Sequence, residues 1–304
     1  MPEKKQDSVY LKFIDLGLGL AKSIPRYFSK YSNKIFCNHQ HIVLLVLRQK
    51  LKMSYRDFAE FLKISNLKLY IGLNRIPHYT TLQKFAKKLK STILANLGLD
   101  CIKLYGPKRN LRLGVDGTGF SLENASKYYS IRACKPTRIS TFMQLSIAAD
   151  LDKQLIAASF IEKRRTIVSS GLIKLVKPAT KLNKISYVAA DKGYDSNANH
   201  EFIIKDLNSR SLIPLRRDSK NPRKWRRKAN EQFNEREYHQ RSKVETIFSV
   251  IKRKYGSILK SRNYPMQKKE LLCKLLVYNL DRLVKLTLRI IEGFYTAPKP
   301  CIVT

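Results

Sequence analysis

The chain contains 304 residues, and 43% of them are hydrophobic, which is enough for one large domain or two ordinary domains with a real core. That share of apolar residues excludes a disordered, tail-like protein. The 60 lysine and arginine residues outnumber 23 acidic ones and give a formal net charge of +37 at pH 7. Because so large a charge attracts polyanions, nucleic acid is the expected partner.

A membrane protein and a disulfide-linked protein are not expected. A spanning helix needs about 18 uncharged residues, and the most apolar early stretch, Phe13 to Ile24, is interrupted by Asp15 and Lys22. No signal-peptide pattern follows the N-terminus. The five cysteines lie singly, without a C-x-x-C pair, which argues against a disulfide framework and a zinc site. We expect a cytoplasmic protein that makes no use of a membrane.

Residues 1–105 are predicted to form a helical N-terminal region. Apolar residues recur at helical spacing in 42–47, 55–62 and 82–90. Ser54 is expected to cap the second helix, with Asp57 at the capping-box position, and Thr80 or Thr81 to cap the third. Short helices with a basic last member suit a helix-turn-helix-like DNA-binding unit. A small bundle with a solvated lysine face is an equally good alternative.

Residues 106–292 have the pattern of an α/β domain, followed by a tail at 293–304. The predicted strands are 111–116 (leading into a turn at 117–119), 142–149, 154–161, 185–190 and 211–215, with a turn at 150–153. The predicted helices are 166–176, 196–207, 231–255 and 268–291, and a short basic segment without hydrophobic period, 216–232, is predicted to be a loop. Strands followed by alternating helices and strands predict a mixed sheet with helices on both faces, the order of an RNase H-like fold.

Two acids stand at the ends of predicted strands. Asp116 closes the first strand and precedes a glycine, and Asp191 closes the buried strand 185–190. An unpaired carboxylate is costly to bury beside an apolar strand, and strand ends are the usual address of a site in α/β sheets. Either acid alone could equally be a turn-forming aspartate.

A third acid belongs to a four-residue pattern on the predicted helix 231–255. At 100° per residue, its members fall within a sector of about 60° beside an apolar stripe. One carboxylate for a metal, two cations for phosphates and an aromatic hydroxyl would then share one edge. The alternative is a solvent-exposed face with a helix-spaced Arg241–Glu245 ion pair. The four residues are Tyr238, Arg241, Glu245 and Lys252.

Three carboxylates suit one particular chemistry. Phosphodiester cleavage needs an activated nucleophile and a stabilised leaving oxygen, and two magnesium ions about 3.5–4 Å apart supply both. Magnesium prefers oxygen ligands, so a few Asp and Glu side chains suffice. The five histidines form no recognisable ligand cluster.

Three blocks of the sequence together resemble a known family. Residues 238–252 fill all four positions of the Y-x-x-R-x-x-x-E-x-x-x-x-x-x-K signature of DDE-type insertion-sequence transposases. Residues 115–120 resemble the strand that carries the first Asp of this family. Residues 190–195 resemble the block around its second Asp, including the Gly-Tyr-Asp that follows. The resemblance covers residues 40–285.

The resemblance implies an RNase H-like catalytic domain in which Asp116, Asp191 and Glu245 bind metal and carry catalysis. Mg²⁺ is then the expected cofactor, and Mn²⁺ is expected to substitute for it. The N-terminal region would bind the terminal inverted repeats of a mobile element, and a homodimer or larger assembly would form on double-stranded DNA. The remaining signature residues, which would contact DNA near the cleaved phosphate, are Tyr238, Arg241 and Lys252.

Further basic and aromatic residues are candidate DNA contacts. Arg253 and Lys254 extend the basic end of the signature helix. Trp225, in the 216–232 segment, either stacks on a base or anchors its segment to the core. Some family members carry a large β insertion in this segment, whereas this chain has a short one.

Other acids are ranked below the three. Asp150 and Asp152 are expected to serve their turn, Asp195 could cap the following helix, and Glu201 is a further candidate. Two other functions stay open, a nuclease that cuts without joining and a DNA-binding protein that no longer catalyses. Retention of all three acids argues against the second.

Overall fold

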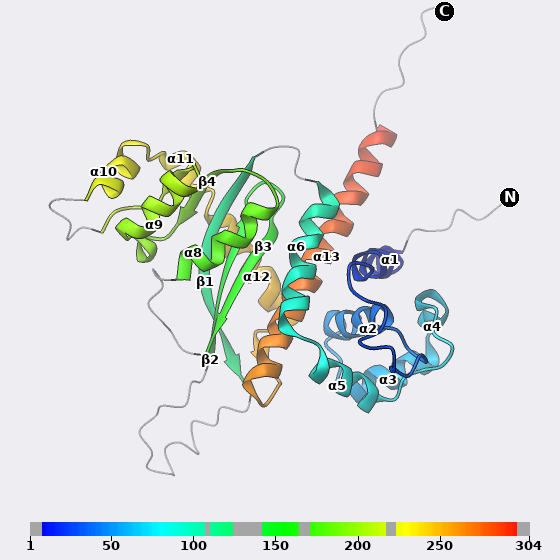
Figure 1. The fold of residues 1–304 in the computed structure, drawn as a ribbon. Coiled ribbons are helices and arrows are strands. Elements are labelled where there is room, and N and C mark those ends of the chain that lie inside the picture. Colours follow the sequence, from blue (N-terminus) through cyan, green and yellow to red (C-terminus); the bar gives the residue numbers. More distant parts are fainter. Residues whose placement is uncertain (1–7, 107–109, 124–141, 164–170, 217–222, 297–304) are drawn as a thin grey trace, which may run out of the picture.

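The computed structural model describes residues 8–106, 110–123, 142–163, 171–216 and 223–296, with side chains through 288 (Figure 1). The first of these ranges contains helices and no strand. Its helices are α1 (Val9–Ala21), α2 (Asn38–Lys50), α3 (Tyr55–Ile64), α4 (Leu67–Ile71), α5 (Tyr79–Lys88) and α6 (Ser91–Tyr105).

Side-chain caps set where α3 and α5 begin. The Ser54 hydroxyl accepts a hydrogen bond from the Asp57 amide at 3.2 Å, as predicted for α3. The expected Thr80 or Thr81 cap is wrong, because α5 begins one turn earlier with His78, whose ring accepts from the Thr80 amide. The apolar face of α5 is buried as predicted, and its lysines face solvent.

The predicted mixed sheet is confirmed. Its order is β3-β2-β1-β4-β5, with the short β6 pairing the far end of β1. The first three strands are antiparallel, whereas β4 and β5 run parallel to β1. The strands are β1 (Leu111–Leu122), β2 (Phe142–Asp150), β3 (Leu155–Glu162), β4 (Ile185–Ala190), β5 (Arg210–Leu212) and β6 (Ile258–Leu259).

Helices cover both faces of the sheet (Figure 1). On one face lie α8 (Leu172–Val176), which continues into a 3-10 turn through Lys181, and α9 (Asn197–Glu201), which continues into a π-helical turn, Phe202–Asp206. The other face is covered by α6, α12 (Ser242–Tyr255) and the long α13 (Tyr264–Thr296). Part of the predicted helix 166–176 lies outside the described residues.

Two predictions about the sheet and its helices are wrong. β1 does not turn at 117–119 but continues to Leu122, because β2 pairs with those residues, Gly117 with Ser146 and Gly119 with Gln144. The predicted helix 231–255 is divided into α11 (Glu235–His239) and α12, and the predicted loop 216–232, of which 217–222 lie outside the described residues, contains α10 (Lys224–Glu231). α10 escaped prediction because it buries little besides Ala229. The Asn234 side chain accepts from the Glu237 amide and starts α11 anew.

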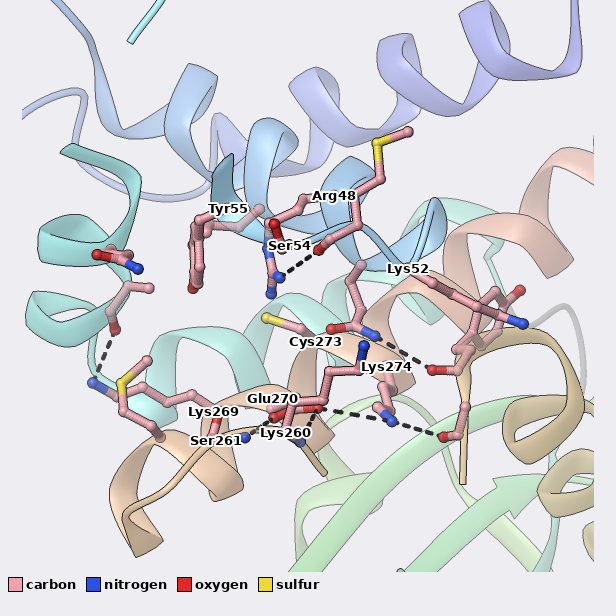
Figure 2. A pocket seen from close by; sticks show the side chains of 18 of the residues that line it. Arg48, Lys52, Ser54, Tyr55, Lys260, Ser261, Lys269, Glu270, Cys273 and Lys274 are labelled. Atoms are coloured by element: carbon pink, nitrogen blue, oxygen red, sulfur yellow. Dashed lines mark hydrogen bonds and ion pairs between the residues drawn. The ribbon is translucent and has the colours of Figure 1, made fainter. Parts of the chain in front are cut away.

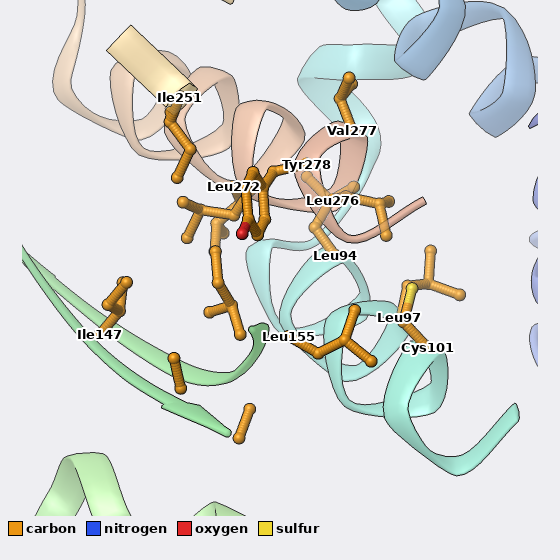
Figure 3. Close-up of a cluster of buried hydrophobic side chains, with 14 of the residues drawn as sticks. Leu94, Leu97, Cys101, Ile147, Leu155, Ile251, Leu272, Leu276, Val277 and Tyr278 are labelled. Atoms are coloured by element: carbon orange, nitrogen blue, oxygen red, sulfur yellow. The ribbon is translucent and has the colours of Figure 1, made fainter. Parts of the chain in front are cut away.

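One hydrophobic cluster runs through the N-terminal helices and the sheet (Figure 3). Figure 3 shows members of this cluster from the helices and the sheet, among them Leu94 and Leu97 of α6, Leu276 of α13 and Ile147 of β2. The buried Asn279 of α13 joins three elements, because its carbonyl oxygen accepts from the Ile156 amide at 2.9 Å and its amide group donates to the carbonyls of Ile156 and Gly98. α13 continues to Thr296, past the expected start of the tail, and 297–304 lie outside the described residues.

Ion pairs and hydrogen bonds add to this joint between the N-terminal helices and the rest. Asp281 of α13 binds the Lys50 ammonium of α2 and accepts from the Tyr255 hydroxyl of α12. Lys269 of α13 donates to the carbonyls of Ala86 and Lys87, at the end of α5. Among the described residues, no helix is long and apolar enough to cross a membrane.

Candidate active site

Of the two predicted aspartates, Asp116 lies on β1 and Asp191 directly follows the neighbouring parallel strand β4. Val115 of β1 pairs with Ala190 of β4, so Asp116 and Asp191, the next residues, stand side by side. Each carboxylate accepts a hydrogen bond from the following amide, Gly117 N–H at 2.8 Å and Lys192 N–H at 2.7 Å. These bonds fix one oxygen of each acid and leave the second oxygen for another partner.

Glu245 reaches the same place from α12. This helix packs closely on β1 at Gly114, where a Cβ atom would lie 2.7 Å from Val244 Cγ2. Only a glycine permits that approach. The next residue of the helix, Glu245, is 59% exposed at its side chain, whereas the Asp116 side chain is 20% exposed.

Arg241 connects the carboxylates of β1 and α12. It stands at the N-cap position of α12. One guanidinium nitrogen lies 3.1 Å from Asp116 Oδ2 and the other lies 3.1 Å from Glu245 Oε1. The Arg241–Glu245 pair that the helical spacing allowed is therefore present, and the same side chain also binds Asp116. That second contact could not be deduced from spacing along one helix.

The other two acids act on the pKa of Asp116. Burial raises the pKa of Asp116 above its usual value; the Gly117 amide and Arg241 oppose this rise, whereas the charges of Glu245 and Asp191 add to it. Burial also raises the pKa of Tyr194 to about 12, and the charges of Asp116 and Asp191 contribute. The pKa of Arg241 lies above its usual value despite burial, because Asp116, Tyr238 and Glu245 surround it with negative charge and hydrogen-bond acceptors.

The donor set is chemically suited to a hard divalent cation, since all three side chains offer carboxylate oxygens. Within the described ranges, no group of three or more His, Cys, Asp or Glu side chains is arranged so that it could hold a metal ion as it stands. The Asp116 and Glu245 carboxylates are instead gathered around the guanidinium of Arg241.

The other signature residues border this cluster. The Lys252 ammonium donates to the Thr118 hydroxyl at 2.7 Å, two residues beyond Asp116 on β1. Tyr238 lies on α11 rather than α12, and its ring centroid is 5.9 Å from the Arg241 guanidinium carbon. Arg241 and Lys252 therefore contact β1 directly, whereas Glu245 and Tyr238 are connected to it through Arg241.

The remaining candidates lie further from the acids along the chain. Arg253 and Lys254 are exposed on the last turn of α12. Trp225 is half-buried on α10, with the Lys224 and Lys228 ammonium groups 5.2 and 5.8 Å from its ring centroid. Both interpretations of Trp225 stay open.

A buried polar network stands behind Asp191 and was not predicted. Asp195 does not cap α9, whose cap is Ser196. Its carboxylate is fully buried and binds the Arg226 guanidinium of α10 and His200 of α9. His200 also bonds the Ser211 hydroxyl of β5 at 2.9 Å. Burial alone would raise the pKa of Asp195, but the bonds from Arg226, the Arg216 amide and His200 hold it below its usual value.

This network supports the turn that carries Asp191. The Arg216 side chain donates to the carbonyls of Lys192 and Gly193 at 3.2 and 2.8 Å, while its amide donates to Asp195. The two residues that follow Asp191 are thereby tied to the segment after β5. No spacing in the sequence marks these partners, because they come from four separate segments. Asp150, in contrast, serves its turn as predicted, accepting from the Asp152 amide.

A cavity of about 980 Å³ lies between the N-terminal helices and α13, away from the acids (Figure 2). Its basic side chains mostly bind backbone carbonyl groups, either on their own side of the joint or across it. Arg48 donates to the Met53 carbonyl and Lys52 to that of Arg253, and Lys274 donates to the carbonyls on either side of Ser257. Figure 2 shows side chains from both sides of the joint facing one another across the space. Of these cations, Lys52 connects the two sides of the joint.

The order of the strands and the helices on both faces of the sheet define an α/β domain of the RNase H-like class. Its acids lie where β1, β4 and α12 meet. Residues 109–280, more than half of the chain, match the family described as the transposase DDE domain, and the chain belongs to that family. No curated protein matches it. Among solved structures, a piggyBac transposase synaptic complex with hairpin DNA, determined by cryo-EM, is 13% identical, with a TM-score of 0.44 over 97% of this chain and 80% of that chain.

Proposed function

We propose that the chain binds the terminal inverted repeats of a mobile DNA element and catalyses metal-dependent cleavage of its ends and strand transfer. The observation that carries this proposal is the meeting of Asp116, Asp191 and Glu245 from three separate elements. Membership of the transposase DDE domain family supports it. The net charge of +37 fits a double-stranded DNA partner.

In this proposal, Asp116, Asp191 and Glu245 hold the divalent cations, Mg²⁺ or Mn²⁺. The cations would activate the attacking hydroxyl and stabilise the leaving oxygen. Arg241 and Lys252 would then face phosphate oxygens, where negative charge develops during the reaction. Thr118 keeps the Lys252 ammonium close to β1, so that this charge is positioned before DNA arrives.

Two reactions would follow one another at the same site. In the first, water attacks the phosphorus at the element end, the P–O3′ bond breaks, and the element keeps a free 3′-hydroxyl. In the second, that hydroxyl attacks a phosphorus of target DNA, and a target 3′-oxygen leaves with the proton. Both ends must be joined, so a homodimer or larger assembly on DNA belongs to the proposal.

The test is magnesium-dependent cleavage of a labelled duplex taken from the DNA that borders the coding sequence. Glu245→Gln keeps the shape of the side chain but removes its charge, so we expect cleavage to be lost while DNA binding persists. Glu235→Gln is the matched control, because that side chain is 81% exposed on α11 and forms an ion pair with His239 of the same helix. Cleavage by Glu245→Gln at the wild-type rate would reject the proposed site.

The products separate the proposal from its rivals. Cleavage followed by joining of the 3′ end to a second duplex supports a transposase. Cleavage without joining, under conditions where both ends are supplied, favours a nuclease. Tight binding without cleavage in Mg²⁺ or Mn²⁺ favours a DNA-binding protein that has lost catalysis.

A further inference from the structure

Arg241 occupies the position between two of the acids that the proposed function assigns to metal. Its two terminal nitrogens bind Asp116 and Glu245, each at 3.1 Å, and its side chain is only 19% exposed. Asp116 already gives its other oxygen to the Gly117 amide. A cation that took both carboxylates would therefore have to displace the guanidinium.

We propose that Arg241 is an internal cation that competes with the divalent metal, and that a DNA phosphate draws it away, so that DNA and metal bind cooperatively. This inference rests on the proposed function, because it takes the three acids to be the metal ligands. It adds a regulation of that site: the protein without DNA holds metal weakly.

The position of Arg241 allows it to move without unfolding a helix. It stands at the start of α12, directly after the short α11 ends. A change of its side-chain rotamer breaks two ion pairs but no helical hydrogen bond. The ring of Tyr238, 5.9 Å away, offers the guanidinium a second favourable contact beside the acids.

The balance of charge explains why DNA would be needed. Three carboxylates near one another repel, and Arg241 relieves part of that repulsion. A planar guanidinium group also forms bidentate hydrogen bonds with phosphate. A phosphodiester therefore offers Arg241 a partner equivalent to the two carboxylates that it leaves. Once the guanidinium has moved to the phosphate, the acids regain their repulsion and their affinity for a divalent cation rises.

Cooperativity of this kind is reciprocal. If DNA raises the affinity for metal by some factor, metal raises the affinity for DNA by the same factor, typically about 5- to 150-fold. Removing Arg241 should remove the coupling at its source. It should also tighten metal binding in the absence of DNA, because the competing cation is gone.

The test is a titration of the full chain with Mn²⁺, in which free Mn²⁺ is measured by electron paramagnetic resonance, without and with a short duplex. The duplex alone is titrated in parallel. For the wild type we expect Mn²⁺ binding to tighten at least fivefold when DNA is added, the lower limit of the typical range. For Arg241→Gln we expect binding without DNA to be tighter than in the wild type, and the effect of DNA to disappear.

Two further variants make the result specific. Arg241→Lys carries a single point charge that cannot bridge both acids as well, so its coupling should be intermediate. Arg236→Gln removes an equal charge from an exposed position on α11 and should behave like the wild type. Circular dichroism of each variant shows whether it is folded.

Each outcome bears on one of the two proposals. If Arg241→Gln binds Mn²⁺ no more tightly than the wild type without DNA, Arg241 does not compete with metal, and the inference is overturned. If Glu245→Gln leaves Mn²⁺ binding unchanged with DNA present, the acids are not the metal site. That second result would reject the proposed function itself, whatever the Arg241 variants do.

Discussion

Asp116 shows what a single residue contributes that spacing cannot reveal. Asp116 was a candidate because it ends a predicted strand and precedes a glycine. Asp191 was a candidate because it also ends a predicted strand. The register that sets the two side by side, Val115 opposite Ala190, comes from pairing between distant strands. The Arg241–Asp116 contact likewise joins residues far apart in sequence, so the sequence could identify the members of the cluster but not the bonds among them.

Gly114 is the residue whose replacement should displace the cluster. A Cβ atom there would lie 2.5 Å from Leu151 Cδ2 and 2.7 Å from Val244 Cγ2. We expect Gly114→Ala to lower the free energy of unfolding by about 1–3 kcal/mol through overpacking, and to reduce cleavage by moving Glu245. Urea denaturation and the cleavage assay measure the two effects.

The matched control is Gly19→Ala in α1, where a Cβ would meet nothing within 4 Å. Alanine is the better helix former, so the free energy of unfolding of this variant should rise by about 0.5–1 kcal/mol. Equal stability of the two variants would contradict the close packing of α12 on β1.

At the scale of elements, the sequence predicted most strands and helices but missed how the segment before α12 is divided. The helices α10, α11 and α12 stand where part of a loop and one long helix were expected, because side-chain caps such as Asn234 interrupt an otherwise helical pattern. α10 is fixed by the bond from Arg226 to Asp195 rather than by an apolar face. Tertiary contacts of this kind leave no periodic signal.

The Asp195–His200 pair in this segment predicts how stability depends on pH. Burial lowers the pKa of His200, against the opposing effect of Asp195. The unfolded chain takes up a proton near pH 6.5, whereas the folded chain resists it to a lower pH. The contribution of His200 to the free energy of unfolding should therefore be complete above about pH 6.5 and should be lost as the pH drops below that value.

Urea denaturation between pH 7.5 and pH 5, conditions chosen to span about 6.5, measures this slope. His200→Gln keeps a donor for Asp195 but cannot titrate, so its slope should be smaller. Some slope should persist, because burial also lowers the pKa of His41. An unchanged slope in His200→Gln would show that His200 does not titrate on unfolding.

At the scale of the whole molecule, the charge of +37 was evident from composition, but its distribution was not. Part of it lies inside the joint between the N-terminal helices and α13, where Lys269 and Lys274 bind carbonyl groups. Another part, including Arg253 and Lys254, is exposed at the end of α12. Only exposed cations, such as those at the end of α12, can contact DNA phosphates and release counterions from them.

Exposed cations at the end of α12 should therefore control the salt dependence of DNA binding. If Arg253 and Lys254 each contact one phosphate, replacing both with Gln should lower the slope of log K against log salt by about 1.8. Fluorescence anisotropy of a labelled duplex at several salt concentrations measures it. Lys205→Gln, which removes an exposed lysine on the opposite face of the sheet beside Glu201, should leave the slope unchanged.

β1 is the hub of the sheet, since it pairs with β2, β4 and β6. Its partners emerge from the ribosome at widely separated times, because β4 ends at Ala190 and β6 begins at Ile258. Until β4 is synthesised, β1 and β2 form the end of an incomplete sheet with an open edge. Contacts so distant in sequence close slowly. A nascent chain stopped before residue 185 should thus be the species most prone to aggregate or to need a chaperone.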